Sequence, residues 1–182
     1  EYKNYLEINY PLIPKFYGKQ KENNFLIIQY IHGQTLNKYD VEKLQLEDKI
    51  TIIIELMLII KYLHDNNFVY RDLKPNNVIF DENKTVFLID FDRMININSP
   101  FHLFSNYTRS FSSDFVAPEV NYGEISYNND IYSLGKIIEY LQIKNDKINS
   151  FYHKCTRPKA DQRLSIFELM IDFYTCLLES QN

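Results

Sequence analysis

The feature that most constrains this chain is a polar loop followed by the pattern of a short β-hairpin. The loop runs from Tyr70 to Asn77, with the sequence Tyr-Arg-Asp-Leu-Lys-Pro-Asn-Asn, and Asp90-Phe91-Asp92 begins eighteen residues after Asp72. Between them, residues 78–80 and 85–89 are rich in branched and aromatic side chains, and the turn between these runs is polar. This pattern predicts two short strands joined by a tight turn. Asn77 then enters one strand and Asp90 follows the other.

This spacing suits phosphoryl transfer to a hydroxyl group. That reaction depends on positioning and charge neutralisation more than on covalent catalysis. The oxygens of Asn77 and Asp90 are hard ligands of the kind that Mg²⁺ takes together with nucleotide phosphates. A single Arg-Asp pair would more simply be a solvated turn, but eight residues in register with Asp90 favour a site.

The loop and the Asp-Phe-Asp segment together resemble the catalytic core of eukaryotic protein kinases. The resemblance implies that Asp72 accepts the proton of the substrate hydroxyl and that Lys74 faces the transferred phosphate. It also implies that Asn77 and Asp90 bind the Mg²⁺ of Mg-ATP. Lys74-Pro75 is typical of the Ser/Thr type, whose partner is a protein substrate.

Further motifs extend the resemblance towards the carboxyl end. Ala117-Pro118-Glu119 matches the end of a kinase activation segment, and the resemblance pairs Glu119 with Arg163. Asp130 is expected to begin a central buried helix and to anchor the backbone of the catalytic loop. The segment 96–114 is long for a plain connection, as functional loops often are. Within it, the resemblance implies that Ser112 contacts the catalytic residues and that Thr108 is a phosphorylation site.

The amino-terminal segment resembles part of a kinase small lobe. Residues 13–18 and 24–30 are expected to be strands, followed by a hinge at 31–36. The resemblance implies a gatekeeper and an adenine site whose residues are Ile28, the backbone of Gln29 and Ile31, and the side chains of Leu36 and Ile79. Glu1 takes the place of the glutamate that orients the ATP-binding lysine.

Four aromatic residues have two possible roles. The resemblance implies that they form the stack that couples the two kinase lobes, whereas ordinary core packing would use the same contacts. These residues are Tyr5, Phe16, Tyr70 and Phe91.

The expected fold is α+β, with a mainly helical large lobe and a remnant of a β small lobe. We expect residues 1–182 to be an incomplete kinase domain, with the small-lobe remnant and hinge strand at 1–30 and the large lobe at 31–182. No glycine-rich phosphate loop and no partner lysine precede Glu1, and there is no initiating Met. We therefore interpret the sequence as a truncated product or an incomplete gene model, and expect it to be inactive by itself.

Composition supports one globular unit and excludes some classes of partner. The chain has 45% hydrophobic residues and a net charge of -4, which gives no basic surface for nucleic acid or an anionic membrane. The most apolar run, 50–63, contains Glu55 and Lys61 and is too short to span a bilayer, so it predicts a buried helix. No secretory signal is visible, and a cytoplasmic location is expected. The oligomeric state stays open.

Two departures from the kinase pattern bear on activity. Asp92 replaces a glycine, which predicts a loss of backbone freedom and adds a third carboxylate near the metal site. The short interval between Asp130 and Arg163 predicts that a substrate-docking helix is reduced or missing.

Three functions remain open at this stage. The leading one is an ATP- and Mg²⁺-dependent Ser/Thr protein kinase. A pseudokinase that acts as a binding or scaffold module is the alternative. The third is a small-molecule kinase of the aminoglycoside or choline type, because Ile89-Asp90-Phe91-Asp92 resembles their second metal motif; those families lack the Ala-Pro-Glu segment paired with a distal Arg.

Overall fold

The structure is a computed structural model that describes residues 1–99 and 114–179. Its α-helices are α1 (Tyr2–Glu7), α2 (Leu46–Asp65), α3 (Asn128–Tyr140), α4 (Asp146–Cys155) and α5 (Ile166–Glu179). Its strands are β1 (Phe16–Lys19), β2 (Leu26–Ile28), β3 (Gly33–Thr35), β4 (Phe68–Val69), β5 (Val78–Asp81), β6 (Val86–Leu88) and β7 (Ile95–Asn96). Short 3₁₀ turns lie at η1 (Leu36–Lys38), η2 (Pro75–Asn77), η4 (Pro118–Tyr122) and η5 (Ala160–Gln162).

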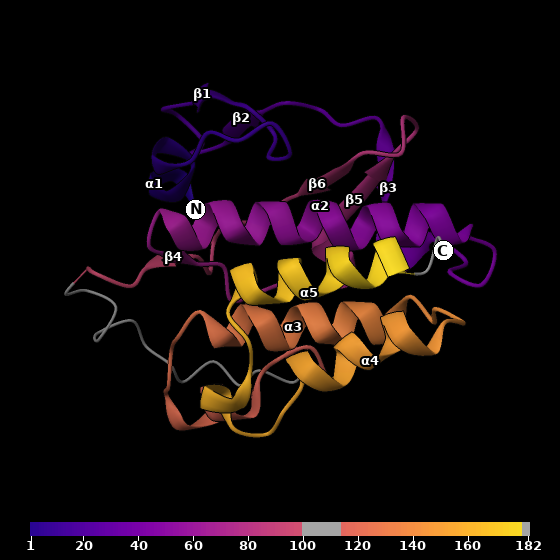
Figure 1. Cartoon of the computed structure of the whole chain (residues 1–182). Helices are drawn as coiled ribbons and strands as arrows, with labels where there is room; N and C mark the ends of the chain where they lie inside the picture. Colours follow the sequence, from indigo (N-terminus) through magenta and orange to yellow (C-terminus); the bar gives the residue numbers. More distant parts are fainter. Residues whose placement is uncertain (100–113, 180–182) are drawn as a thin grey trace.

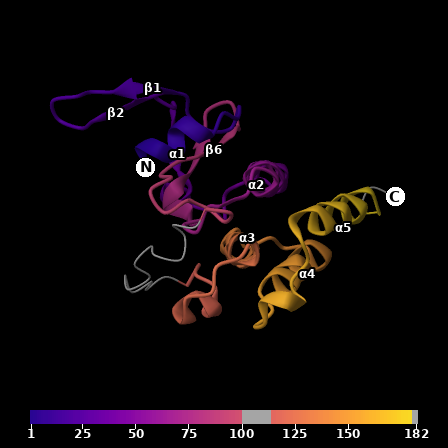
Figure 2. The same ribbon diagram turned by 90° about the vertical axis from the view of Figure 1, so that its left-hand side faces the viewer.

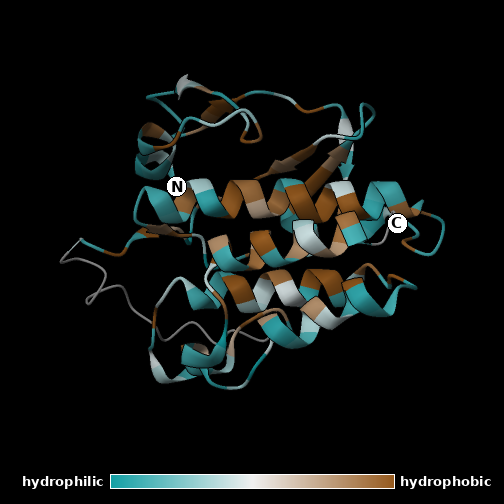
Figure 3. Ribbon diagram, viewed as in Figure 1, coloured by the Kyte–Doolittle hydropathy of each residue, from teal (hydrophilic) through white to brown (hydrophobic). Residues whose placement is uncertain are grey.

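Helix α2 is the centre of the core. Its apolar residues occur on nearly every turn, and Ile52, Ile53, Leu56 and Ile60 are completely buried. A helix that is apolar on most of its surface has to be covered on several sides. Here α3, α5 and strand β6 cover it, and Figure 3 shows the resulting hydrophobic bands along α2 and its neighbours.

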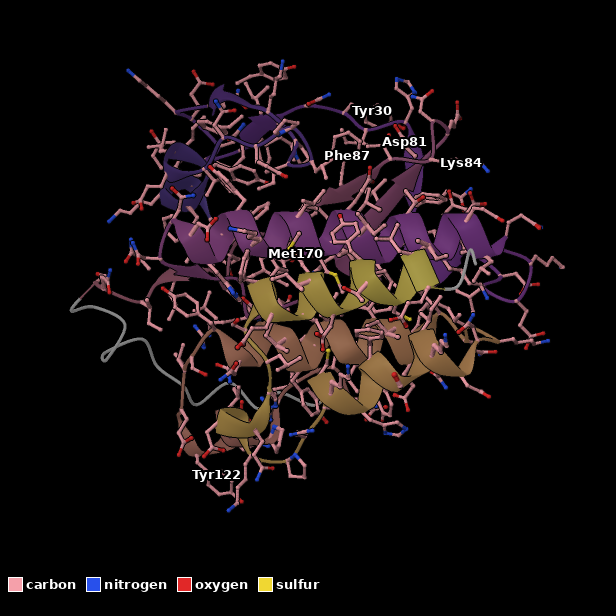
Figure 4. The ribbon with its side chains drawn as sticks, viewed as in Figure 1. Tyr30, Asp81, Lys84, Phe87, Tyr122 and Met170 are labelled. Carbon is pink, nitrogen blue, oxygen red and sulfur yellow. The ribbon has the colours of Figure 1, made fainter. Side chains whose placement is uncertain are left out.

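Helices α3, α4 and α5 form a layered group on one side of α2 (Figure 1). Helix α3 contacts both α2 and α4, and α5 contacts α2 and α4. Figure 4 shows Met170 of α5 at the boundary with α2, in agreement with its packing against the core. In Figure 2, α1 and the β1–β2 hairpin lie at the opposite end of the molecule from α4 and α5. The amino-terminal part therefore contacts the helical body only along one side.

Three small antiparallel sheets connect the helices to the loops. Strands β3, β5 and β6 form one sheet, β1 pairs with β2, and β4 pairs with β7. Gly33 of β3 lies against β5 so closely that a Cβ atom would come within 2.7 Å of the Asp81 Cα and of the Phe80 carbonyl oxygen. Only glycine fits this approach without a shift of the backbone.

The α+β prediction is confirmed, and so are the α2 helix and the β5–β6 hairpin that joins Asn77 to Asp90. The predicted strands 13–18 and 24–30 are too long: β1 begins only at Phe16, and β2 ends at Ile28. Pro14 has no N–H to donate, and the β1–β2 register shifts between Phe16 and Gly18, so regular pairing is short.

The expected reduction of the docking helix agrees with the structure. Between α3 and Arg163, α4 is the one α-helix, and only residues 141–145 connect it to α3. Within 1–99 and 114–179, no helix has both the length and the apolar character needed to cross a membrane.

Candidate functional site

A cleft of about 480 Å³ lies between the amino-terminal segment and the β3–β5–β6 sheet. Its lining residues are Glu1, Tyr5, Pro14, Ile28, Gln29, Tyr30, Ile31, Gly33, Ile79, Ile89 and Asp90. Most of these side chains are apolar, which suits a flat ring, and the carboxylates lie at one end. Four of the five residues that the sequence assigned to ATP are thus together in one cleft.

Leu36 is the exception among those five. It is completely buried in the hydrophobic core and does not line the cleft. Because η1 begins at Leu36 directly after β3, its side chain packs into the core of the large lobe. The cofactor contact of Leu36 therefore stays a prediction that the lining of this cleft does not support.

Residues 29–32 connect β2 to β3, and their backbone offers polar groups to the cleft. The Gln29 N–H already donates to the Lys15 carbonyl oxygen at 2.7 Å, so the Gln29 carbonyl is its group that could meet a ligand. Tyr30 is 76% exposed at the mouth of the cleft, and Figure 4 labels it near Phe87 and Asp81 at the edge of the sheet. A ligand here would be covered from one side by β5 and Ile79.

Asp72 is the best-connected carboxylate of the site. Its Oδ2 accepts from Lys74 Nζ at 2.8 Å and from Asn77 Nδ2 at 2.9 Å. Its Oδ1 lies 3.6 Å from Arg93 Nη1. Asp72 is nearly buried, so these cations compensate a charge that would otherwise be costly to remove from water. The loop residues Asp72, Lys74 and Asn77 are thus together, as predicted.

Asn77 and Asp90 are brought together by backbone pairing. The Ile89 N–H donates to the Asn77 carbonyl oxygen at 3.0 Å, so Asp90 follows directly beside Asn77. Asn77 Nδ2 also donates to the Asp72 carbonyl oxygen at 2.9 Å, which turns the Asn77 amide oxygen to the other side. This oxygen and the Asp90 carboxylate are the hard ligands that Mg²⁺ prefers, with the remaining ligands left to phosphates and water. Within the described ranges, His, Cys, Asp and Glu alone make no cluster of three that could hold a metal.

Glu1 lies at the same end of the cleft. Burial raises the pKa of Glu1, and the neighbouring carboxylate of Asp90 raises it further. Repulsion between two carboxylates is the usual reason that such a site attracts a cation. Glu1 is therefore placed beside the predicted metal ligands.

Asp92, in place of a glycine, carries no left-handed backbone strain in this structure. Asp92 does not have a positive φ, whereas Asp90, two residues before it, has a φ of 63°. The left-handed conformation therefore falls on Asp90, a residue type that tolerates it. The Asp92 side chain is 61% exposed, so the third carboxylate points largely into water.

Asp130, completely buried at the start of α3, holds the catalytic loop. Its Oδ2 accepts from the Tyr70 N–H at 2.9 Å, and its Oδ1 accepts from the Arg71 N–H at 2.8 Å. His64 Nε2, from the end of α2, lies 2.9 Å from the same Oδ2. Arg71 has a φ of 72°, so these bonds fix a conformation that would otherwise be unfavourable.

Glu119 and Arg163 form a buried, bidentate salt bridge. Arg163 Nη1 donates to Glu119 Oε1 at 2.6 Å, and Nη2 donates to Oε2 at 2.9 Å. Asn129 Nδ2 donates to the same Oε1 at 2.8 Å. Burial alone would raise the pKa of Glu119, but the hydrogen bonds from Arg163 and Asn129 outweigh it and hold this pKa below its usual value.

The four aromatic residues are in contact as a chain. Phe16 stacks on Tyr5 with ring centroids 5.9 Å apart, and Phe91 meets Tyr5 at 5.3 Å and Tyr70 at 5.4 Å, edge to face. Tyr70 also donates its hydroxyl to the Ile89 carbonyl oxygen at 2.5 Å. This chain joins β1, α1 and the catalytic loop.

Three polar residues of the site were not found from the sequence. Arg93 faces Asp72, His64 contacts Asp130, and Asn129 binds Glu119. His64 carried one signal, because it is a polar residue at an inward position of an otherwise apolar helix. Arg93 lies in a turn and Asn129 lies at the start of α3. At such places no periodic pattern indicates which way a side chain points. Thr108 and Ser112 lie outside the described residues.

Comparison with known proteins identifies the family to which this fold belongs. The family described as the protein kinase domain matches residues 1–173. The chain therefore belongs to the protein kinase family.

Individual relatives are bacterial, viral and animal kinases. The chain is 32% identical over 139 residues to serine/threonine-protein kinase D of Synechocystis, covering 72% of this chain and 27% of that protein. It is 33% identical over 148 residues to putative serine/threonine-protein kinase R436 of Acanthamoeba polyphaga mimivirus, covering 74% and 52%. It is 35% identical over 127 residues to the membrane-associated tyrosine- and threonine-specific cdc2-inhibitory kinase wee-1.3 of Caenorhabditis elegans, covering 68% and 18%. The chain thus spans about half or less of the length of these relatives.

Proposed function

We propose that this chain is the catalytic part of a Ser/Thr protein kinase that transfers the γ-phosphoryl group of ATP to a protein hydroxyl. The single observation that carries the proposal is the arrangement around Asp72, with Lys74 and Asn77 on one carboxylate oxygen. The names of the bacterial and viral relatives favour serine and threonine as acceptors. In this proposal, residues 1–30 belong to the small lobe and 31–182 to the large lobe, with Thr108 and Ser112 in the activation segment.

Each residue of the site has a part in the proposed reaction. Ile79 packs against adenine, and Gln29 and Ile31 offer backbone groups to its edge. Asp72 orients the acceptor hydroxyl through its Oδ1 and takes the proton as the hydroxyl oxygen attacks phosphorus. Lys74 stabilises the charge on the transferred group. Mg²⁺, held by Asn77 and Asp90, would neutralise the phosphates when bound.

A pseudokinase is the second candidate, and one observation favours it. None of the cleft-lining residues in the described parts of the chain is a Lys or Arg. Apart from Lys74 beside Asp72, phosphates in such a cleft depend on Mg²⁺ for charge compensation, which allows binding without efficient transfer. The third candidate, a small-molecule kinase, is disfavoured by the buried Glu119–Arg163 pair, which supports a protein-kinase activation segment.

A phosphotransfer assay with Asp72→Asn, made in a protein that includes a complete small lobe, tests the proposal. Loss of the base should lower the rate at least about a hundredfold, the usual size of a general-base contribution. The fold should be kept, because the amide has the same shape and can still accept from Lys74. Asp65→Asn, which removes a carboxylate paired with Lys61 on the surface of α2, is the matched control and should retain the wild-type rate.

Two results would contradict the proposal. If Asp72→Asn transfers phosphate as fast as Asp65→Asn, Asp72 is not the base of the reaction. If the wild type with a complete small lobe binds Mg-ATP and shows no transfer to any protein, the pseudokinase is the correct function.

A further inference from the structure

Arg93 lies on the side of Asp72 that faces the acceptor. The Oδ2 atom of Asp72 is taken by Lys74 and Asn77, so Oδ1 is the oxygen left to hold a substrate hydroxyl. Arg93 Nη1 is 3.6 Å from this Oδ1. That separation is longer than a hydrogen bond, so the guanidinium adds positive charge beside Oδ1 without occupying it.

Two contacts place Arg93 beside the loop that carries Asp72. Strand β4 pairs with β7 in a two-residue ladder, Phe68 with Asn96 and Val69 with Ile95, so the segment after β4 and the segment before β7 start side by side. Beyond this ladder, the Arg71 side chain donates from Nη1 to the Arg93 carbonyl oxygen at 3.3 Å.

Charge is unevenly divided across the site. At the nucleotide end, Glu1, Asp90 and Asp92 are carboxylates, and Mg²⁺ is the cation that would balance them. At the acceptor end, the single charge of Asp72 faces both Lys74 and Arg93. Two cations thus lie beside one carboxylate at the acceptor end, and the Arg93 side chain is 35% exposed.

We propose that Arg93 is a specificity-determining residue that binds an anionic side chain next to the phosphorylated residue of the substrate. The proposal rests on the proposed kinase function. Adjacent residues of an extended peptide are about 3.8 Å apart at Cα, so a neighbour of the acceptor lies within reach of a group beside Oδ1. Guanidinium binds carboxylate and phosphate with paired hydrogen bonds, so the preferred neighbour is acidic or already phosphorylated.

The test compares peptides that differ only next to the acceptor serine, with Asp, phosphoserine or Asn at that position. With a complete small lobe present, the wild-type protein should phosphorylate the Asp peptide with a kcat/KM about tenfold above that of the Asn peptide, through a lower KM, as expected for one charge-assisted contact. In Arg93→Gln this ratio should fall to within about twofold. Arg157→Gln, at an exposed arginine that donates to the Gln162 carbonyl, is the matched control and should keep the wild-type ratio.

Equal use of the Asp and Asn peptides by the wild type overturns the proposal, and so does an unchanged ratio in Arg93→Gln. A larger ratio for phosphoserine than for Asp identifies a phosphorylated neighbour as the source of the anion, and the reverse identifies a carboxylate.

Peptide binding without ATP separates this inference from the proposed function. Fluorescence anisotropy should show tighter binding of the Asp peptide than of the Asn peptide to the wild type, and loss of that difference in Arg93→Gln. If this holds while no phosphate is transferred, the kinase function fails and the anion contact stands. If binding of the Asp peptide is the same in Arg93→Gln and in the wild type, the anion contact is refuted whatever the catalytic rate.

Discussion

Among single residues, Arg163 joins the largest set of separate segments. Besides its two bonds to Glu119, it donates to the carbonyl oxygens of Asn128 at 3.0 Å and Arg157 at 2.8 Å. Its guanidinium also lies over the Tyr132 ring at 5.0 Å. The start of α3, the end of the activation segment and the turn before α5 thus share one buried cation.

Replacing Arg163 should therefore be costly. In Arg163→Met the methylene volume is kept but Glu119 is left as a buried charge without its cation, and we expect a loss of about 3 to 5 kcal/mol in the free energy of unfolding. Chemical denaturation measures it. Lys154→Met, which breaks the more exposed pair with Asp172, is the control and should cost less than about 1 kcal/mol. Similar losses in the two variants would show that the Glu119 pair contributes no more than a surface pair.

The Glu119–Arg163 pair also makes the stability of the wild type depend on pH in the acid range. Because the pKa of Glu119 is lower in the folded chain, the stability that ionised Glu119 contributes is complete above the ordinary pKa of 4.5. This stability is lost as the pH falls through the pKa of the folded chain. Denaturation midpoints measured from pH 6 downward should decline more steeply below about pH 4.5 in the wild type than in Arg163→Met.

The sequence identified the residues of the site whose spacing is local. Asp72, Lys74 and Asn77 lie within one loop, and their mutual contacts follow from that spacing. Arg93 and His64 lie beside the site because segments far apart in the sequence meet there, and local spacing does not show such contacts. The burial of Leu36 away from the cleft has the same origin, because the direction of its side chain depends on the turn after β3.

At the scale of elements, α3 and α4 pack closely because of one glycine. A Cβ at Gly135 would come within 2.5 Å of the Cys155 Cβ and 2.8 Å of the Thr156 Cγ2. The α3–α4 contact is therefore a backbone-to-side-chain approach of the kind that excludes any larger residue.

Gly135→Ala should thus destabilise the protein in spite of the better helix propensity of alanine. The gain of about 1 kcal/mol in propensity is opposed by an overpacking cost of about 1 to 3 kcal/mol, so the net change is a loss. Thermal unfolding measures it, with Glu139→Ala on the exposed side of α3 as the control, expected within about 0.5 kcal/mol of wild type. A higher melting temperature for Gly135→Ala would show that α4 can move away at little cost.

The helix with a strong hydrophobic pattern was predicted from the sequence. Strands that form only where distant segments of the chain meet were not. The run 50–63 is apolar enough to indicate a buried helix, and α2 contains it. Strands β4 and β7 have two residues each, and they exist because two distant loops meet, so neither was predicted. The short β1 and β2 strands reflect proline and a register shift, which limit pairing in ways that residue composition does not show.

At the scale of the whole molecule, the aromatic chain from Phe16 to Tyr70 links the amino-terminal segment to the helical body. The cleft beside it has apolar walls but no Lys or Arg among its lining residues in the described chain. Nucleotide phosphates would lie at the end that carries Glu1 and Asp90, where anions repel them unless a cation intervenes.

Residues 1–182 by themselves should therefore bind ATP weakly and only with Mg²⁺. We expect a dissociation constant above about 0.1 mM, or less than about 5.5 kcal/mol, and no measurable protein phosphorylation. Calorimetry with and without EDTA measures the first, and a radiolabel transfer assay measures the second. Asp90→Ala should abolish the Mg²⁺-dependent heat, whereas Asp65→Asn should keep it. Tight binding in EDTA, or phosphorylation that disappears in Asp90→Ala, would contradict this expectation.

The anchoring of the catalytic loop by Asp130 has a consequence for its dynamics. The amide hydrogens of Tyr70 and Arg71 are bonded to a carboxylate that is itself buried at the start of α3. These amides can exchange with deuterium only when α3 separates from the loop, which requires opening of the core. The Tyr70 and Arg71 amides should therefore exchange at the slow rate of the central helices, although most loop amides exchange quickly. The start of the loop that carries Asp72 should thus keep its conformation unless the core opens.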